Sequence, residues 1–241
     1  MAKNHGIAGK NAREMANRRY MKATIITGVL FLIAVVWFYN FNSIIKLGLP
    51  VIAVLAAVMI LAADRLEKKG LFIKRRARDA DRGAHAEEVV SERLASLPEG
   101  YHAFHDLAFD GFNIDHVVVG PGGIFLVETK SHREEVTAQG DTLLLGGKQP
   151  AKNFLNQAWS QAYQLRALLE KRTSREWKIK PILCFTRAFV KVREPVKGVE
   201  VLNKKYLASY LSRQPQIFGT EEIETVSRIM RSRVSGQSDH V

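Results

Sequence analysis

Residues 113–130 read NIDHVVVGPGGIFLVETK, and this stretch decides the fold. Two runs of β-branched and aromatic residues, 114–119 and 124–129, flank a turn-forming Gly-Pro-Gly-Gly segment at 120–123, which predicts a β-hairpin. Neither run alternates strictly between apolar and polar residues. We therefore expect both strands to be buried on both faces, as in the sheet of an α/β domain.

The hairpin register brings charged residues together at its open end. If residues 120–123 form a four-residue loop, Val119 faces Ile124, and counting along both strands places Asp115 opposite Glu128. Directly opposed residues have Cβ atoms about 4.5–5.5 Å apart. Lys130 lies two positions beyond Glu128 and therefore projects from the same face. The spacing predicts two carboxylates and one ammonium group at the end of an apolar hairpin.

This grouping of charges suits metal-dependent hydrolysis. Two carboxylates so close raise each other's pKa unless a positive charge lies between them. Mg²⁺ (or Mn²⁺) binds one or two carboxylates and fills its other positions with water and phosphate oxygens, and metal-bound water can attack a phosphodiester. Lys130 can orient that water or stabilise the transition state. A simpler alternative is a solvated strand end, with Asp115 as a cap and Glu128–Lys130 as a surface pair.

The segments around the hairpin predict an α/β domain with a mixed sheet. Apolar residues recur at helical spacing from residue 81 to residue 97, which predicts a helix ended by Pro98. On a later helix we expect Trp159, Tyr163 and Leu165 to pack into the core. The remaining expected elements are strands at 101–107, 135–138, 142–145, 179–186 and 199–202, helices at 153–171, 204–213 and 220–234, a turn at 109–111 and a disordered tail at 235–241.

Charge is distributed unevenly along the chain, whose formal net charge is +12 over 241 residues. Residues 1–78 hold 14 Lys and Arg against 3 Asp and Glu, whereas residues 79–241 hold 22 against 21. The excess belongs to the N-terminal third, which excludes a uniformly basic protein that coats nucleic acid. The single cysteine, Cys184, excludes an intramolecular disulfide framework and a Cys-rich zinc site.

Two uncharged apolar runs of 17 residues each, 23–39 and 47–63, occupy the N-terminal third. Each is near the lower limit of about 17–25 residues for a membrane-spanning helix. Basic residues precede the first run and follow the second, while the linker carries only Lys46, so the positive-inside rule places both flanks in the cytoplasm. We expect a two-pass protein of the cell (inner) membrane, with both termini and the catalytic domain cytoplasmic.

Three other interpretations of this N-terminal third compete with a membrane hairpin. A cleaved signal peptide has a shorter apolar region and a small-residue cleavage site, which does not follow Tyr39. A soluble helical hairpin would carry polar stripes, and neither run has one. The basic flanks could also contact nucleic acid or anionic lipid headgroups.

The run from Asn113 to Lys130 resembles the signature of the NERD (nuclease-related) domain, a family similar to the PD-(D/E)XK nuclease superfamily. Upstream, GAHAEEVV at 83–90 resembles the family's G-x-x-G-E-x-x-V helix, with Ala86 in place of the second glycine. Downstream, NFLNQ at 153–157 resembles its N-P-x-x-Q segment, with Phe154 in place of the proline. The resemblance covers about residues 82–202 and leaves the D…ExK core intact.

The resemblance implies a PD-(D/E)XK-like mixed sheet flanked by helices, here preceded by two transmembrane helices. It implies Asp115 and Glu128 as metal ligands with Glu87 as an additional acidic residue, Lys130 as the catalytic lysine and Gln157 as a polar group at the site edge. The expected cofactor is Mg²⁺ or Mn²⁺, and the expected partner is nucleic acid, DNA or RNA. Because the superfamily also contains domains that bind without cutting, a catalytically silent, membrane-anchored binding or scaffold module remains the alternative.

The local charge pattern agrees with a phosphate-backbone substrate. Residues 79–147 hold 4 Lys and Arg against 13 Asp and Glu, and residues 148–213 hold 15 against 4. An acidic half that binds metal beside a basic half suits nucleic acid. The expected organisation is a basic cytoplasmic N-terminus (1–22), a transmembrane hairpin (23–63), a juxtamembrane linker (64–80), a NERD-like nuclease domain (81–213) and a C-terminal helix with its tail (214–241).

Overall fold

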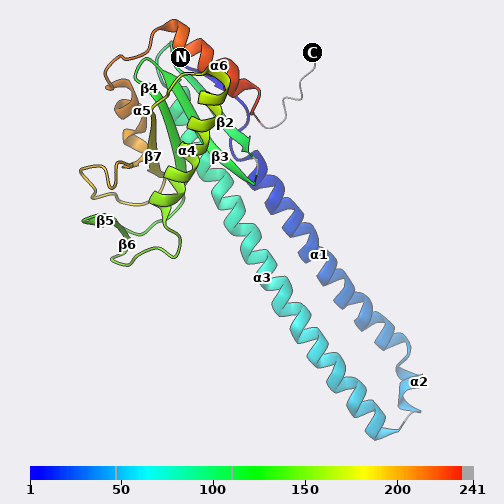
Figure 1. Cartoon of the computed structure of the whole chain (residues 1–241). Coiled ribbons are helices and arrows are strands. Elements are labelled where there is room, and N and C mark those ends of the chain that lie inside the picture. Colours follow the sequence, from blue (N-terminus) through cyan, green and yellow to red (C-terminus); the bar gives the residue numbers. More distant parts are fainter. Residues whose placement is uncertain (47, 110, 235–241) are drawn as a thin grey trace. The chain divides into compact units, whose positions relative to one another are not determined.

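The computed structural model describes residues 1–46, 48–109 and 111–234. The expected tail at 235–241 and the centre of the expected turn, Asp110, therefore lie outside the described residues. The chain divides into two compact units (Figure 1): a helical unit of residues 12–81, and an α/β unit that combines residues 1–11 with the chain from Arg82 onward. The α/β unit is thus built from two separate segments of the sequence.

The helical unit consists mainly of two long helices, α1 (Lys10–Tyr39) and α3 (Leu49–Ala95), with the short α2 (Phe41–Ile45) between them. Of the helices that the structure describes, α1 and α3 are long and apolar enough to cross a membrane, by length and composition, and their apolar stretches are almost entirely unburied. The two helices run side by side (Figure 1), and Arg19 Nη1 donates a hydrogen bond to the carbonyl oxygen of Arg76 at 2.8 Å. Residues 64–80 continue α3 without a break, since they contain mostly strong helix formers.

In the described part of the chain, six strands form one mixed sheet in the order β1-β2-β3-β4-β7-β8. The pairs β2/β3 and β3/β4 are antiparallel, and the pairs β1/β2, β4/β7 and β7/β8 are parallel. A separate antiparallel hairpin is formed by β5 and β6. The strands are β1 (Lys3–His5), β2 (His102–Phe109), β3 (Phe112–Gly120), β4 (Gly123–Lys130), β5 (Val136–Gln139), β6 (Thr142–Leu145), β7 (Ile179–Phe185) and β8 (Glu200–Asn203).

The predicted register of the hairpin is confirmed, but its strands are longer than expected, because Gly120 and Gly123 also pair and leave a two-residue turn. Val119 pairs with Ile124, and the ladder continues to His116 opposite Val127. The side chains of β4 alternate between the two faces of the sheet, as in any strand. Because β4 lies between β3 and β7 and both faces are covered, residues 123–128 are all buried. This explains why its sequence is continuously apolar rather than alternating.

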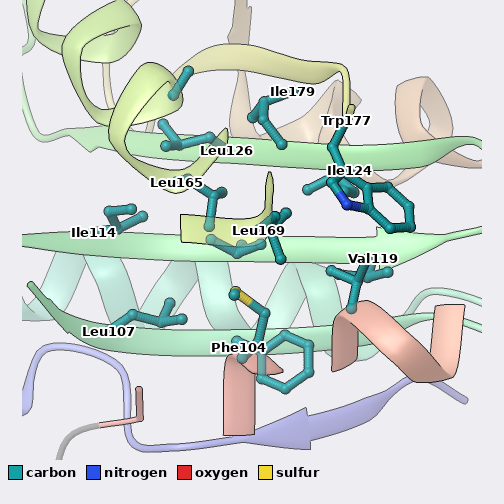
Figure 2. Close-up of a cluster of buried hydrophobic side chains, with 14 of the residues drawn as sticks. Phe104, Leu107, Ile114, Val119, Ile124, Leu126, Leu165, Leu169, Trp177 and Ile179 are labelled. Carbon is teal, nitrogen blue, oxygen red and sulfur yellow. The ribbon is translucent and has the colours of Figure 1, made fainter. Parts of the chain in front are cut away.

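Helices cover both faces of the sheet. On one face, α4 (Phe154–Thr173) and α6 (Thr220–Arg231) pack against β2, β3 and β4, and Figure 2 shows Leu165 and Leu169 of α4 within this apolar cluster. On the other face, the last turns of α3 and the helix α5 (Lys204–Ser212) form a second cluster. Leu165 is buried as predicted, but the expectation that Tyr163 packs into the core is wrong, because 59% of this residue is exposed.

Candidate active site

Three carboxylates lie at one level of the sheet, on neighbouring strands. They belong to Asp106 of β2, Asp115 of β3 and Glu128 of β4. The register of β2 on β3 is the same on both sides of Asp106 and Asp115, yet these two residues form no ladder pair in the described sheet. Asp106 has a φ of 54°, in the left-handed region that few residues other than glycine adopt. Glu128 follows the last β3–β4 pair, opposite Asp115, where the predicted register places it. Such local irregularities re-aim side chains and are frequent beside active sites.

Glu128 is the centre of a tight polar group. Its Oε1 atom accepts hydrogen bonds from Lys130 Nζ at 2.6 Å and from Gln157 Nε2 at 2.6 Å. Lys130 also donates to Gln157 Oε1 at 3.1 Å, and its ammonium group lies 4.5 Å from the ring centroid of Phe154. Asn153 caps α4 and so fixes the first turn that carries Gln157. The predicted placement of Glu128 and Lys130 on one face is confirmed.

The electrostatics of the site oppose the ionised form of its carboxyl groups. Asp115 accepts a hydrogen bond from the backbone N–H of Thr129 at 2.8 Å. Its pKa is nevertheless raised well above the usual value, first by desolvation and then by the charges of Glu128 and Glu87. Burial, followed by the charges of Asp106 and Glu128, raises the pKa of Glu87 to about 8. Without a counter-cation, the site therefore disfavours the ionised form of both carboxyl groups.

One buried atom of the site has unused capacity for a ligand. Glu128 Oε2 is buried and has no hydrogen-bond partner among the described residues, a costly state that a bound cation would relieve. Within residues 1–46, 48–109 and 111–234, no group of three or more His, Cys, Asp or Glu side chains is arranged to hold a metal. The implied ligands Asp115, Glu128 and Glu87 therefore do not form a ready three-residue cage. Their oxygen chemistry and the open Oε2 fit a hard divalent cation held by one or two carboxylates.

A chain of hydrogen bonds connects the site to the N-terminal strand. Asn4 Oδ1 contacts His105 Nε2 at 3.3 Å, the Nδ1 atoms of His105 and His116 lie 2.8 Å apart, and His116 Nε2 lies 3.2 Å from Thr129 Oγ1. Burial lowers the pKa of His105 to about 4 and that of His116 well below its usual value, so both rings are neutral at physiological pH. The chain ends on Thr129, whose backbone N–H binds Asp115.

Residues 1–11 also bind two of the acidic side chains directly. The backbone N–H and the Nδ2 atom of Asn11 donate to Asp106 Oδ2 and Oδ1, each at 2.8 Å. The backbone N–H of Gly9 binds Glu87 and lowers its pKa in part. Gly9 has a φ of 72°, and a Cβ there would lie 2.7 Å from the carbonyl oxygen of Ala84. Only glycine therefore brings this backbone so close to α3.

Asp106 and Asn11 belong to the site but were not predicted from the sequence. The sequence context of Asp106 could have predicted it, because a carboxylate lies in the middle of the strand sequence HAFHDLAF. That is the same argument that singled out Asp115. Asn11 has no such context, because its partner lies far along the chain.

One of three comparisons with known proteins matches the segment of the chain that carries this site. Residues 82–186 match the family model of NERD, the nuclease-related domain; this segment runs from the last part of α3 to the end of β7 and contains every predicted site residue. Among solved structures, protein VC1899 from Vibrio cholerae is 11% identical, with 90% of this chain and 57% of that chain covered and a TM-score of 0.25, a likeness too weak to support an argument. This chain thus spans 57% of the length of that protein chain. A comparison with curated proteins finds no match. Residues 82–186 are thus similar to the nuclease-related domain family NERD.

Proposed function

We propose that this chain is a membrane-anchored nuclease that hydrolyses phosphodiester bonds of DNA or RNA with Mg²⁺ or Mn²⁺ at the cytoplasmic face. The observation that carries the proposal is the state of Glu128. One carboxylate oxygen is held by Lys130 and Gln157, and the other is buried without a partner among the described residues. The nuclease-related family match supports the same reaction class.

The side chains have separate roles in this proposal. Asp115 and Glu128 would hold the cation, with Glu87 as an additional acidic ligand. The bound cation would supply an acidified water and neutralise charge on the phosphate. Lys130 would donate to the attacking water or to a phosphate oxygen as negative charge develops there. Gln157 would position Lys130 through the 3.1 Å hydrogen bond to its ammonium group.

The membrane anchor is supported by two independent features. The apolar stretches of α1 and α3 are almost unburied, and basic residues flank them. In addition, residues 1–11 and the chain from Arg82 onward belong to one compact unit. The segments before and after the hairpin must therefore lie on the same side of any membrane, which two spans permit and one span does not.

A second candidate function is a membrane-anchored module that binds nucleic acid, or serves as a scaffold, without cutting it. The observation that favours it is the internal engagement of Lys130, whose ammonium group is bound by Glu128 and Gln157 and lies over the ring of Phe154. A lysine held in this way stabilises the site even if no reaction takes place there.

Cleavage assays on the full chain in detergent micelles separate the two candidates. Labelled single- and double-stranded DNA and RNA are incubated with Mg²⁺, Mn²⁺ or EDTA. The wild-type protein should cut at least one substrate only with metal. Lys130→Ala should slow cleavage by about a hundred- to thousandfold, by analogy with other transition-state donors, while binding metal normally. Glu128→Gln should also weaken metal binding, and the exposed Lys171→Ala on α4 should leave the rate unchanged.

Two results would contradict the nuclease proposal. If Lys130→Ala cuts at the wild-type rate, the assigned site is wrong. If the wild-type protein binds nucleic acid but cuts none of the substrates with either metal, the scaffold function replaces the enzymatic one.

A further inference from the structure

A cavity of about 320 Å³ lies beside α4, and its lining includes none of the candidate-site residues Glu87, Asp115 and Glu128. We call it the α4 pocket. Its walls combine aromatic rings with cationic side chains, which is the composition of surfaces that bind single-stranded nucleic acid. The residues that line the α4 pocket include Trp159, Tyr163, Arg166, Lys178, Lys180 and Gly198.

The aromatic wall is rigid and partly open to solvent. The indole N–H of Trp159 donates to the carbonyl oxygen of Lys197 at 2.8 Å, which fixes the ring. Gly198, with a φ of 74°, passes so close that a Cβ would lie 3.2 Å from the Trp159 ring. Tyr163 stacks on Trp159 with ring centroids 5.4 Å apart and 28° between the planes, and it is 59% exposed. An exposed tyrosine supported by a fixed tryptophan offers a preformed stacking surface.

One exposed cation at the rim of the pocket can meet an anionic ligand. Arg166 is paired with Glu170 and Glu176, so its own charge is compensated. The ammonium group of Lys180 lies on the other face of the sheet, 3.0 Å from Gln214 Oε1 and 5.4 Å from the ring centroid of Phe125. Lys178 is exposed at the rim and supplies a positive charge beside the aromatic surface, where a phosphate attached to a stacked base would lie.

The pocket is also within reach of the proposed active site. Gln157 and Tyr163 belong to the same helix, six residues apart, so they are separated by about 9 Å along its axis. That distance corresponds to about two or three nucleotides of a stacked strand at about 3.4 Å each. Six residues also rotate the helix by about 600°, so Gln157 and Tyr163 point about 120° apart, and a strand that contacts both must curve around α4.

We propose that the α4 pocket binds an unpaired nucleobase of the substrate strand, by stacking on Tyr163, and so selects single-stranded over duplex nucleic acid. This inference rests on the proposed nuclease function. In a duplex, neighbouring bases cover both faces of each base, so the tyrosine ring has no face to contact. An unpaired base presents its face freely, and Lys178 contacts the adjoining phosphate.

The test measures binding without cleavage, on the full chain in micelles with EDTA present. Fluorescent oligonucleotides of about 12 nucleotides, within the usual site size of about 4–16, are compared as a single strand, as a duplex and as an abasic strand with the same phosphates. Tyr163→Ala should weaken single-strand binding by about 5- to 150-fold, the loss of one base–aromatic stack. Tyr163→Phe, which keeps the ring, should bind normally. The control is Tyr206→Ala on α5, because Tyr206 is 60% exposed and lies outside the α4 pocket.

The abasic strand should bind weakly and equally to wild type and Tyr163→Ala. Three results would overturn the proposal that the α4 pocket binds a base. Tyr163→Ala could bind the single strand as well as wild type does, or it could lose as much affinity for the abasic strand or the duplex as for the single strand. The third such result is that the wild-type protein binds no oligonucleotide. Failure of the nuclease proposal is distinguishable. Tyr163-dependent binding without any cleavage leaves the pocket standing, whereas Lys130-dependent cleavage with Tyr163-independent binding rejects the pocket alone.

Discussion

Asn11→Ala tests whether the first turn of α1 supports the acidic site. The substitution removes the 2.8 Å hydrogen bond from Nδ2 to Asp106 Oδ1 but keeps the backbone bond to Oδ2. Hydrogen bonds to charged groups contribute about 1.5–3 kcal/mol. Asp106 is only 4% exposed, so water cannot easily replace the lost donor, and we expect a loss in the upper half of that range. For a unit of about 150–250 residues, 1 kcal/mol lowers Tm by about 2–4 °C. The expected decrease in Tm is therefore about 4–12 °C.

The assay is thermal unfolding of the full chain in micelles, followed by tryptophan fluorescence. The matched control is Asn17→Ala, the same substitution at an exposed position of the same helix, which should change Tm by less than about 2 °C. Asn11→Asp should destabilise more than Asn11→Ala, because it opposes two carboxylates. Equal Tm values for Asn11→Ala and Asn17→Ala would refute the conclusion that Asn11 holds Asp106 in place.

Two further predictions concern pH and topology. The pKa of Glu87 is raised to about 8 in the folded state, so folding takes up a proton between about pH 4.5 and 8. In EDTA, the free energy of unfolding should therefore fall as pH rises through this range, by at most about 5 kcal/mol. Glu87→Gln should abolish this part of the pH dependence, which denaturant unfolding at pH 5 and pH 8 measures. The same pH dependence in wild type and Glu87→Gln would contradict the prediction. A reporter inserted at Asn42 should be extracytoplasmic and one at the C-terminus cytoplasmic, and two cytoplasmic reporters would exclude the membrane hairpin.

The hairpin and its charged end could be predicted because the relevant information is local. A glycine-rich loop at 120–123 fixes the register, and the register alone places Glu128 opposite Asp115 and beside Lys130. The N-cap at Asn153 likewise predicts the helix that brings Gln157 to the site. These arguments need only residues that are close in sequence or directly paired.

The N-terminal strand could not be predicted in the same way. Residues 3–5 are Lys-Asn-His, with no β-branched residue and no apolar alternation, so local propensity favours no strand there. The strand exists because β2 offers an unpaired edge and because Ala2 and Lys3 donate backbone hydrogen bonds to Leu97 and Tyr101. Those partners follow both apolar helices in the sequence, and no pattern in a short window connects them.

The split construction of the α/β unit sets the order in which the protein can fold. The partner strand of residues 3–5 begins about 100 residues later in the chain. At about 5–20 residues per second, residues 3–5 therefore leave the ribosome about 5–20 s before it. During that interval both apolar helices are synthesised, and their antiparallel pairing brings the two ends of the intervening chain together. Pairing of the two helices therefore reduces the entropic cost of closing the long loop between β1 and β2. The acidic site therefore obtains its contacts with Gly9 and Asn11 only after the N-terminal segment has returned to β2 and α3, so a chain whose two apolar helices have not paired lacks these contacts.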